Sequence, residues 1–196
     1  MRQDRFWHLK LERIPDVDIA QMTGFAGEQI DRFLYTVREI VNEAHLLSED
    51  RLQPRAMDAL DYLRKAGVRL VLVTLRSHDQ AVQMLKRFGI YHYFSAIQGS
   101  TDEFAAYDNY AHSKAAMLEK LMSTLHPQDS DLLWMIGDTE ADVLSAKELG
   151  IGSIALSCGM RSQAYLQRLE PNYVLGDLGV AAEFLVEQII RKGQLH

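Results

Sequence analysis

Short apolar runs alternate with longer amphipathic segments along most of the chain, from residue 68 to the C-terminus. Runs of this length are typical of strands buried in a parallel sheet, and the segments between them are long enough to form helices. The pattern predicts an α/β fold class, a Rossmann-like parallel sheet sandwiched by helices. We expect strands at residues 68–74, 96–98, 132–136, 153–156 and 173–175.

The first fifty residues follow a different pattern. Apolar side chains recur there at the spacing of one helix face, and no strand pattern is visible. We predict a helical region over residues 1–50 and an α/β core over residues 51–196. The apolar face is expected to pack against the core or a partner helix. It consists of Ile30, Phe33, Leu34, Val37, Ile40, Val41 and Ala44.

Composition limits the possible classes of function. The chain has 196 residues, 47% of them hydrophobic, which is enough for one sizeable core. A formal charge of −6 and the lack of any lysine or arginine run do not favour nucleic acid as a partner. No apolar run approaches the roughly 20 residues that span a bilayer. The single Cys158 excludes an internal disulfide and favours a cytoplasmic protein, whose oligomeric state the sequence leaves open.

Polar residues that directly follow apolar runs are the candidates for chemistry, because ligands bind beyond the carboxyl ends of parallel strands. Thr74 ends the run Leu-Val-Leu-Val-Thr. Lys114 follows Ser113, which we expect to cap a helix. Asp138 and Asp142 belong to the segment Gly-Asp-Thr-Glu-Ala-Asp, which follows another apolar run.

Each candidate also has a structural explanation. Thr74 is a β-branched residue that suits a strand, and Asp138 suits a turn. Asp142 stands three residues after Thr139, so the two could form a capping box. The positive charge of Lys114 near the positive N-terminal end of the helix dipole would cost about 0.3–1 kcal/mol. Solvent screening reduces this cost if the side chain is exposed. As a set, however, a hydroxyl and an ammonium can hold a phosphate, and carboxylates can hold Mg²⁺.

In their order and spacing these segments resemble the motifs of the haloacid dehalogenase superfamily, in particular its phosphoglycolate-phosphatase-like hydrolases, over residues 53–185. The resemblance implies a Mg²⁺-dependent hydrolase of small phosphorylated metabolites. Thr74 and Lys114 would bind the substrate phosphate, Lys114 and Asp142 would serve in catalysis, and Asp138 would ligate Mg²⁺. The helices of residues 1–50 would form part of a cap over the site, which excludes water and selects substrates.

The resemblance also implies a first motif, DxDGT after an apolar strand, whose two aspartates act as nucleophile and as general acid and base. The sequence contains no DxDGT. Asp16-Val17-Asp18 follows Pro15 and lacks the Gly-Thr turn, which argues against an interior strand. We therefore expect a core without its first strand, inactive as it stands, through either N-terminal truncation or degeneration.

In this family the first strand is central, between the strands that end at Thr74 and Ile136. Its loss would remove stability comparable to that of a whole domain. The chain is therefore expected either to fold poorly alone or to fill the position with another segment. Residues 8–14 are the local candidate, although their alternating pattern suits a sheet edge better.

Two further interpretations remain open. The chain could be a non-catalytic module that keeps the pocket of Thr74, Lys114 and Asp138 for an anion or Mg²⁺, or that acts through partner contacts. A dinucleotide-binding domain is disfavoured, because the Gly-Ile-Gly at residues 150–152 follows a helix and lacks the third glycine. Arg161 could reach a substrate anion or simply be a solvated residue at a helix start.

Overall fold

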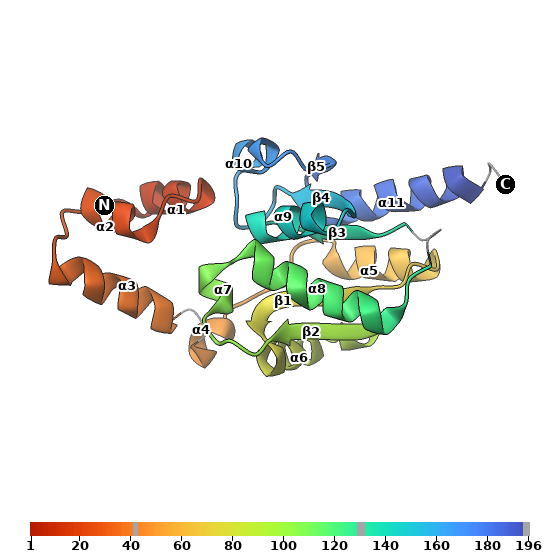
Figure 1. The fold of residues 1–196 in the computed structure, drawn as a ribbon, viewed down its shortest axis with the longest axis horizontal. Helices are drawn as coiled ribbons and strands as arrows, with labels where there is room; N and C mark the ends of the chain where they lie inside the picture. The colour runs from red at the N-terminus through yellow and green to blue at the C-terminus, as the bar shows by residue number, and fades with distance from the viewer. Residues whose placement is uncertain (41–42, 129–131, 194–196) are drawn as a thin grey trace.

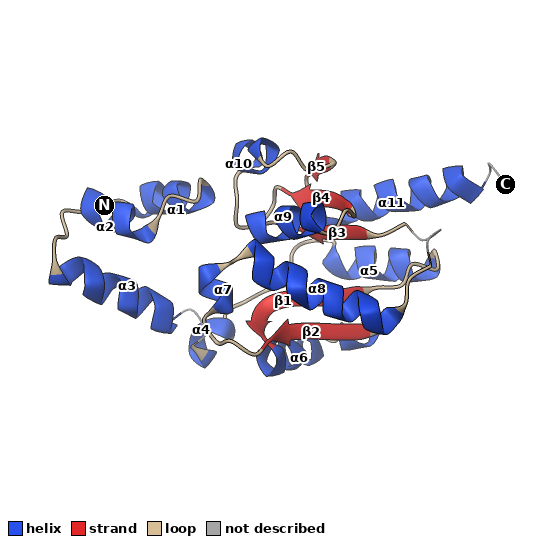
Figure 2. Ribbon diagram, in the orientation of Figure 1, coloured by secondary structure: helices blue, strands red, loops and turns tan. Residues whose placement is uncertain are grey.

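Parallel strands flanked by helices make up the computed structural model, which describes residues 1–40, 43–128 and 132–193 (Figure 1). The predicted α/β fold class is confirmed. Strands from both sheets carry their arrowheads at the same end of the molecule, the end nearer to the helices of the first fifty residues (Figure 2). Ligands are expected at this carboxyl end.

The described strands form two separate sheets, and every pairing is parallel. In the first sheet β1 (Val71–Ser77) pairs with β2 (Ala96–Ser100). In the second sheet β4 (Gly152–Leu156) lies between β3 (Trp134–Gly137) and β5 (Tyr173–Leu175). Within the described residues β1 and β3 have no strand between them. These are the two strands between which the sequence predicted a central strand to be missing.

Strands occur at all five predicted positions, with ends that differ from the prediction by up to three residues. The first strand begins and ends three residues later than predicted, because the turn that ends the preceding helix uses residues that we assigned to the strand. Gly67 has a positive φ of 79°, and the Val68 N–H donates to the Leu63 carbonyl at 3.0 Å. Gly89 and Gly150 adopt the same left-handed conformation after their helices, as predicted.

The first fifty residues are helical, as predicted. Their helices are α1 (Gln3–Leu11), α2 (Asp16–Met22), α3 (Glu28–Ile40) and α4 (Ala44–Leu47). No residue of α3 is fully buried, so its apolar face is only partly covered. Val41 lies outside the described residues. The proposal that residues 8–14 replace the central strand is wrong, because that segment begins in α1 and its last residues form a turn.

The remaining helices cover the two sheets. Pairs that are distant in sequence pack together: α5 on α11, and α8 on α9. Among the described helices, none is long and apolar enough to cross a membrane. In chain order they are α5 (Ala56–Lys65), α6 (His78–Arg87), the 3₁₀-helix η1 (Tyr91–Tyr93), α7 (Ala105–Asp108), α8 (Ala111–Leu125), α9 (Glu140–Glu148), α10 (Gln163–Arg168) and α11 (Leu178–Gly193).

Side-chain packing, instead of strand pairing, joins the two sheets. The core cluster formed by α5, α11 and β4 includes the fully buried Leu63 and Ile154, and it also contacts Leu70 before β1. A second cluster brings Leu75 of β1 against Ala141 of α9. Apolar burial of this kind is the main stabilising contribution to such a fold. The prediction that the chain folds poorly alone remains to be tested.

Candidate active site

The loop between β3 and α9 supplies the two candidate aspartates. Thr139 is the N-cap of α9, and its N–H and Oγ1–H both donate to Asp142 Oδ2, at 3.0 and 2.7 Å. The predicted capping box is therefore confirmed. Gly137 makes room for this arrangement, because a Cβ at that position would lie 2.1 Å from Asp142 Cγ.

Lys114 reaches this loop from α8 and forms an ion pair with Asp142 Oδ1. The two residues are 8% and 5% exposed, so the interpretation of Lys114 as a solvated lysine is wrong. The prediction that Ser113 caps the helix is also wrong. Asn109, with a φ of 52°, ends the preceding helix early, and α8 already begins at Ala111. Lys114 therefore belongs to the body of the helix, where Asp142 compensates its charge.

Asp138 lies in the same loop, directly after β3. Its Oδ2 accepts a hydrogen bond from the Met160 N–H at 2.7 Å. Gly159 packs on the carboxylate so closely that a Cβ there would lie 1.9 Å from Oδ2. Burial raises the pKa of Asp138, and the negative charge of Asp142 raises it further, whereas the Met160 N–H and Lys114 lower it. The net result is a carboxyl group that holds its proton to a higher pH than usual.

Thr74 lies at the carboxyl end of the other sheet. Its Oγ1 accepts a hydrogen bond from the Arg76 N–H at 3.2 Å. Leu75, the next residue, belongs to the same buried cluster as Ala141, which directly precedes Asp142. The structure thus gathers Lys114, Asp138 and Asp142 into one cluster and brings the end of β1 against the helix that carries Asp142. No direct contact joins the Thr74 side chain to this cluster among the contacts of the described residues.

The Asp-x-Asp at residues 16–18 is part of α2 and does not follow a strand. Asp16 accepts hydrogen bonds from Lys10 Nζ at 2.6 Å and from Tyr107 Oη at 2.9 Å. Burial and this bond to Asp16 raise the pKa of Tyr107 to about 12. A second Asp-x-Asp, at residues 129–131, is followed by Leu132 instead of Gly-Thr and lies outside the described residues.

The chemistry of the donors decides whether Mg²⁺ fits this loop. Within residues 1–40, 43–128 and 132–193 there is no group of three or more His, Cys, Asp or Glu side chains that could hold a metal ion. Mg²⁺, however, keeps several waters and usually takes only one or two protein carboxylates together with substrate phosphates. Asp138 supplies such a carboxylate, and the loop therefore fits a magnesium ion that is completed by water and ligand.

Sequence reasoning missed a buried ion network beside this loop. Arg161 is 4% exposed and donates to both Glu140 oxygens, at 2.7 and 3.1 Å, so it is neither solvated nor free for a substrate. Arg13, from the helical region, lies 2.5 Å from Glu140 Oε1. Burial alone would raise the pKa of Glu140, but hydrogen bonds from Arg161 and Asn109 lower it overall. No sequence spacing links these residues.

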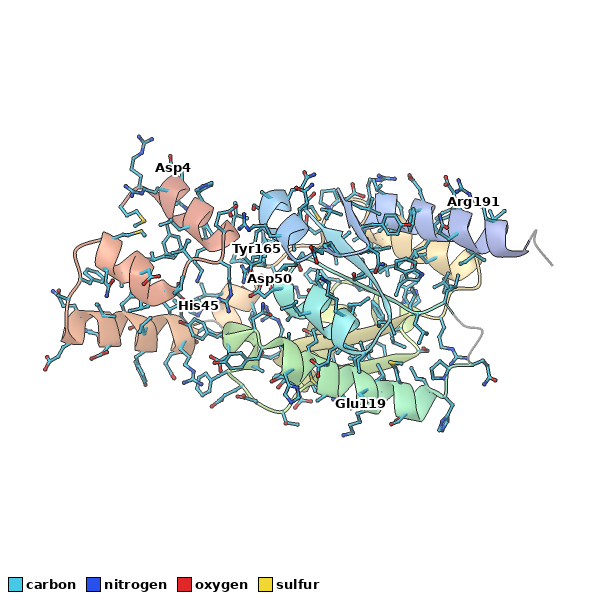
Figure 3. The ribbon with its side chains drawn as sticks, turned by 45° about the horizontal axis from the view of Figure 1, so that its top comes forward. Asp4, His45, Asp50, Glu119, Tyr165 and Arg191 are labelled. Carbon is cyan, nitrogen blue, oxygen red and sulfur yellow. The ribbon has the colours of Figure 1, made fainter. Side chains whose placement is uncertain are left out.

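The segment around Arg13 docks on the core next to the candidate site. Arg161 Nη1 donates to the Lys10 carbonyl at 3.2 Å, and the Ser162 N–H donates to the Leu11 carbonyl at 3.0 Å. Figure 3 labels Tyr165 of α10 and Asp50, the last residue of the helical region, where that region meets the rest of the molecule. The helical region is thus tied to the loop that follows β3 through Glu140.

A buried lysine and carboxylates at the carboxyl edge of a parallel sheet are typical of α/β proteins that bind and transfer phosphoryl groups. The chain belongs to the haloacid dehalogenase-like hydrolase family, whose model matches residues 7–156.

Similar curated proteins include a phosphoglycolate phosphatase from Agrobacterium fabrum, 27% identical over 96% of this chain and 73% of that protein. A phosphoglycolate phosphatase from Vibrio cholerae is 30% identical over 72% of this chain and 59% of its own length. A pyrophosphatase from Halalkalibacterium halodurans is 28% identical over 76% of this chain and 66% of its own length. This chain therefore spans between 59% and 73% of these relatives.

Similar solved structures support the assignment of the chain to this family. A haloacid dehalogenase-like hydrolase from Streptococcus pneumoniae superposes with a TM-score of 0.66 at 26% identity, over 91% of this chain and 80% of that one. A hydrolase of subfamily IA from Geobacter sulfurreducens has a TM-score of 0.62 at 19% identity, over 94% and 80% of the two chains. The second likeness supports the fold only.

Proposed function

We propose that this chain binds a small phosphomonoester and Mg²⁺ at the carboxyl edge of its two sheets, as the phosphate-binding core of a haloacid dehalogenase-type phosphatase. Thr74 would donate its hydroxyl to the phosphate, Lys114 would neutralise phosphate charge, and Asp138 would ligate Mg²⁺. The bound ion would neutralise further negative charge on the phosphoryl oxygens. Residues 1–50 would act as a cap that excludes water.

The buried ion pair between Lys114 and Asp142 is the observation that carries this proposal. Both Asp142 oxygens are used inside the protein, one by Lys114 and the other by Thr139. Asp142 therefore fits a positioning role, in which it holds the lysine, better than a role in direct contact with the substrate. A lysine held in this way loses little side-chain freedom when an anion binds.

Hydrolysis of a phosphomonoester needs a nucleophile, and in this family the nucleophile is expected to be the first aspartate of DxDGT. The sequence has no DxDGT, and Asp16 is occupied by Lys10 and Tyr107. We infer that these 196 residues bind phosphate without turning over a phosphomonoester. The missing motif also keeps the second candidate function open, a non-catalytic module that acts through partner contacts.

Two measurements on the purified chain test the proposal. Calorimetric titration with inorganic phosphate should show binding that Mg²⁺ tightens and that Thr74→Val weakens. Hydrolysis of p-nitrophenyl phosphate should not exceed that of Lys114→Met. Absence of phosphate binding would overturn the proposal in favour of the partner-binding module. Turnover that disappears in Asp138→Ala would support the phosphatase class but overturn the inferred inactivity.

A further inference from the structure

Arg76 is a cation at the carboxyl end of β1 that the proposed phosphate site does not use. It stands two residues after Thr74 and directly before Ser77, which is the N-cap of α6. Because its N–H donates to Thr74 Oγ1, Arg76 is held next to the hydroxyl that we assign to the phosphate. Gly99 of β2 makes room for the start of α6 after Arg76, since a Cβ there would lie 2.4 Å from the His78 Cα.

The guanidinium of Arg76 is incompletely paired in the ligand-free protein. Its side chain is 27% exposed, and Nη1 is buried with no hydrogen-bond acceptor among the described residues. The carboxylate that faces it belongs to Asp50, whose Oδ2 lies 3.8 Å from Nη2, too far for a hydrogen bond. Burial lowers the pKa of Arg76, and Asp50 offsets only part of this effect.

The surroundings of Arg76 favour an anion. The N-terminus of α6, a helix of ten residues, begins at the next position but one and directs its positive end toward this edge. Asp79 in its first turn is exposed, so solvent screens much of its charge. A buried donor without an acceptor is costly, and native proteins that retain one commonly use it for a ligand.

We propose that Arg76 binds a second anionic group, a carboxylate or a further phosphate, on the phosphomonoester whose first phosphate is held by Thr74 and Lys114. The inference rests on the proposed function and narrows its substrate class. The planar guanidinium fork binds carboxylates and phosphates through two parallel hydrogen bonds, and the guanidinium of Arg76 is both incompletely paired and 27% exposed. Substrates with a single phosphate and no other charge would bind less well.

The test compares two probes in the presence of Mg²⁺. Phosphoglycolate carries a carboxylate, and ethyl phosphate has the same phosphate and two-carbon chain without it. The wild-type chain should bind phosphoglycolate about tenfold more tightly or better, as expected for a charge-assisted bidentate contact. In Arg76→Gln the preference should fall below about threefold, whereas the affinity for ethyl phosphate should change little.

Arg69→Gln is the matched control, because Arg69 is an exposed arginine two residues before β1 begins, at the end of the strand opposite to Arg76. It should keep the full preference, and Arg76→Lys should keep only part of it. Equal binding of both probes to the wild type, or an undiminished preference in Arg76→Gln, would overturn the inference and leave the phosphate site standing. Failure of both probes to bind would overturn the inference together with the proposed function.

Urea unfolding should show that Arg76→Gln is no less stable than the wild type, and a marked loss of stability would instead assign Arg76 a structural role.

Discussion

The two halves of the candidate site differ in how completely the protein satisfies its own polar groups. On the β3 side, Asp138 is held by a backbone N–H, and Asp142 is held by Lys114 and Thr139. On the β1 side, Thr74 has a local bond to the Arg76 backbone, and the Arg76 guanidinium retains an unpaired buried nitrogen. The polar groups of the first half are paired before any ligand binds, whereas the second half keeps an incompletely paired guanidinium that can bind one.

This difference separates stability from binding in the predicted effects of mutations. Substitutions on the β3 side that break the finished networks around Lys114 and Glu140 should cost folding free energy. Changes on the β1 side should alter ligand affinity with little cost to the fold.

Lys114→Met should destabilise the chain by about 3–5 kcal/mol, because it leaves the buried Asp142 charge without its partner. Urea unfolding followed by circular dichroism measures this. Lys120→Met, an exposed lysine on the same helix, is the control and should change stability by less than about 0.5 kcal/mol. Equal effects of the two substitutions would refute the structural role of the pair.

Glu140→Gln should cost about 3 kcal/mol, because Arg161 would remain buried without a carboxylate. The substitution should also loosen the helical region, which Arg13 ties to Glu140, and limited proteolysis near residues 10–16 should accelerate. Glu119→Gln, at an exposed position, should do neither. Unchanged proteolysis would contradict the link between this region and the loop.

The same glutamate predicts a pH dependence. The pKa of Glu140 is lowered in the folded chain, so its ion pairs stabilise the fold at pH values above its ordinary pKa. This contribution should disappear as the pH falls below that value toward the lowered pKa. Stability measured against pH should therefore drop less steeply in Glu140→Gln than in the wild type, and parallel curves would contradict the assignment.

Gly159→Ala should cost about 1–3 kcal/mol and weaken Mg²⁺ binding, because the new methyl group would displace the Asp138 carboxylate. Gly176→Ala is the matched control, since a Cβ there meets nothing within 4 Å. Thermal unfolding with and without Mg²⁺ measures both effects. Identical behaviour of the two variants would show that Asp138 tolerates displacement.

Asp138→Asn should have the smallest effect on stability and the opposite sign. Burial raises the pKa of Asp138, so its charge is unfavourable at neutral pH, and the amide should stabilise the ligand-free chain by about 1 kcal/mol. In the wild type this penalty should grow as the pH rises from the ordinary pKa of an aspartate to the raised pKa of Asp138 and stay constant above it, while Mg²⁺ binding strengthens. A destabilised variant that still binds Mg²⁺ would contradict both statements.

The sequence predicted the strands and the loop after β3 because their signals are local. Apolar runs, glycine at left-handed positions and the Thr139–Asp142 spacing each depend on a few neighbouring residues. It did not predict the partner of Lys114 or the start of its helix, since the pair joins residues 28 positions apart. The Glu140 network likewise joins three distant segments. The sequence did not predict the division into two sheets. The expectation that the central strand is missing came from the family resemblance.

The central claim is that two separate sheets build one site for phosphate and its metal. Calorimetric titration of inorganic phosphate at several Mg²⁺ concentrations, in the wild type, Thr74→Val, Asp138→Asn and the double variant, tests it most directly. We expect that Mg²⁺ tightens phosphate binding, that each single variant removes this effect, and that the double variant is no worse than either. Strictly additive losses, or phosphate binding indifferent to Mg²⁺, would show that Thr74 and Asp138 do not serve a common ligand.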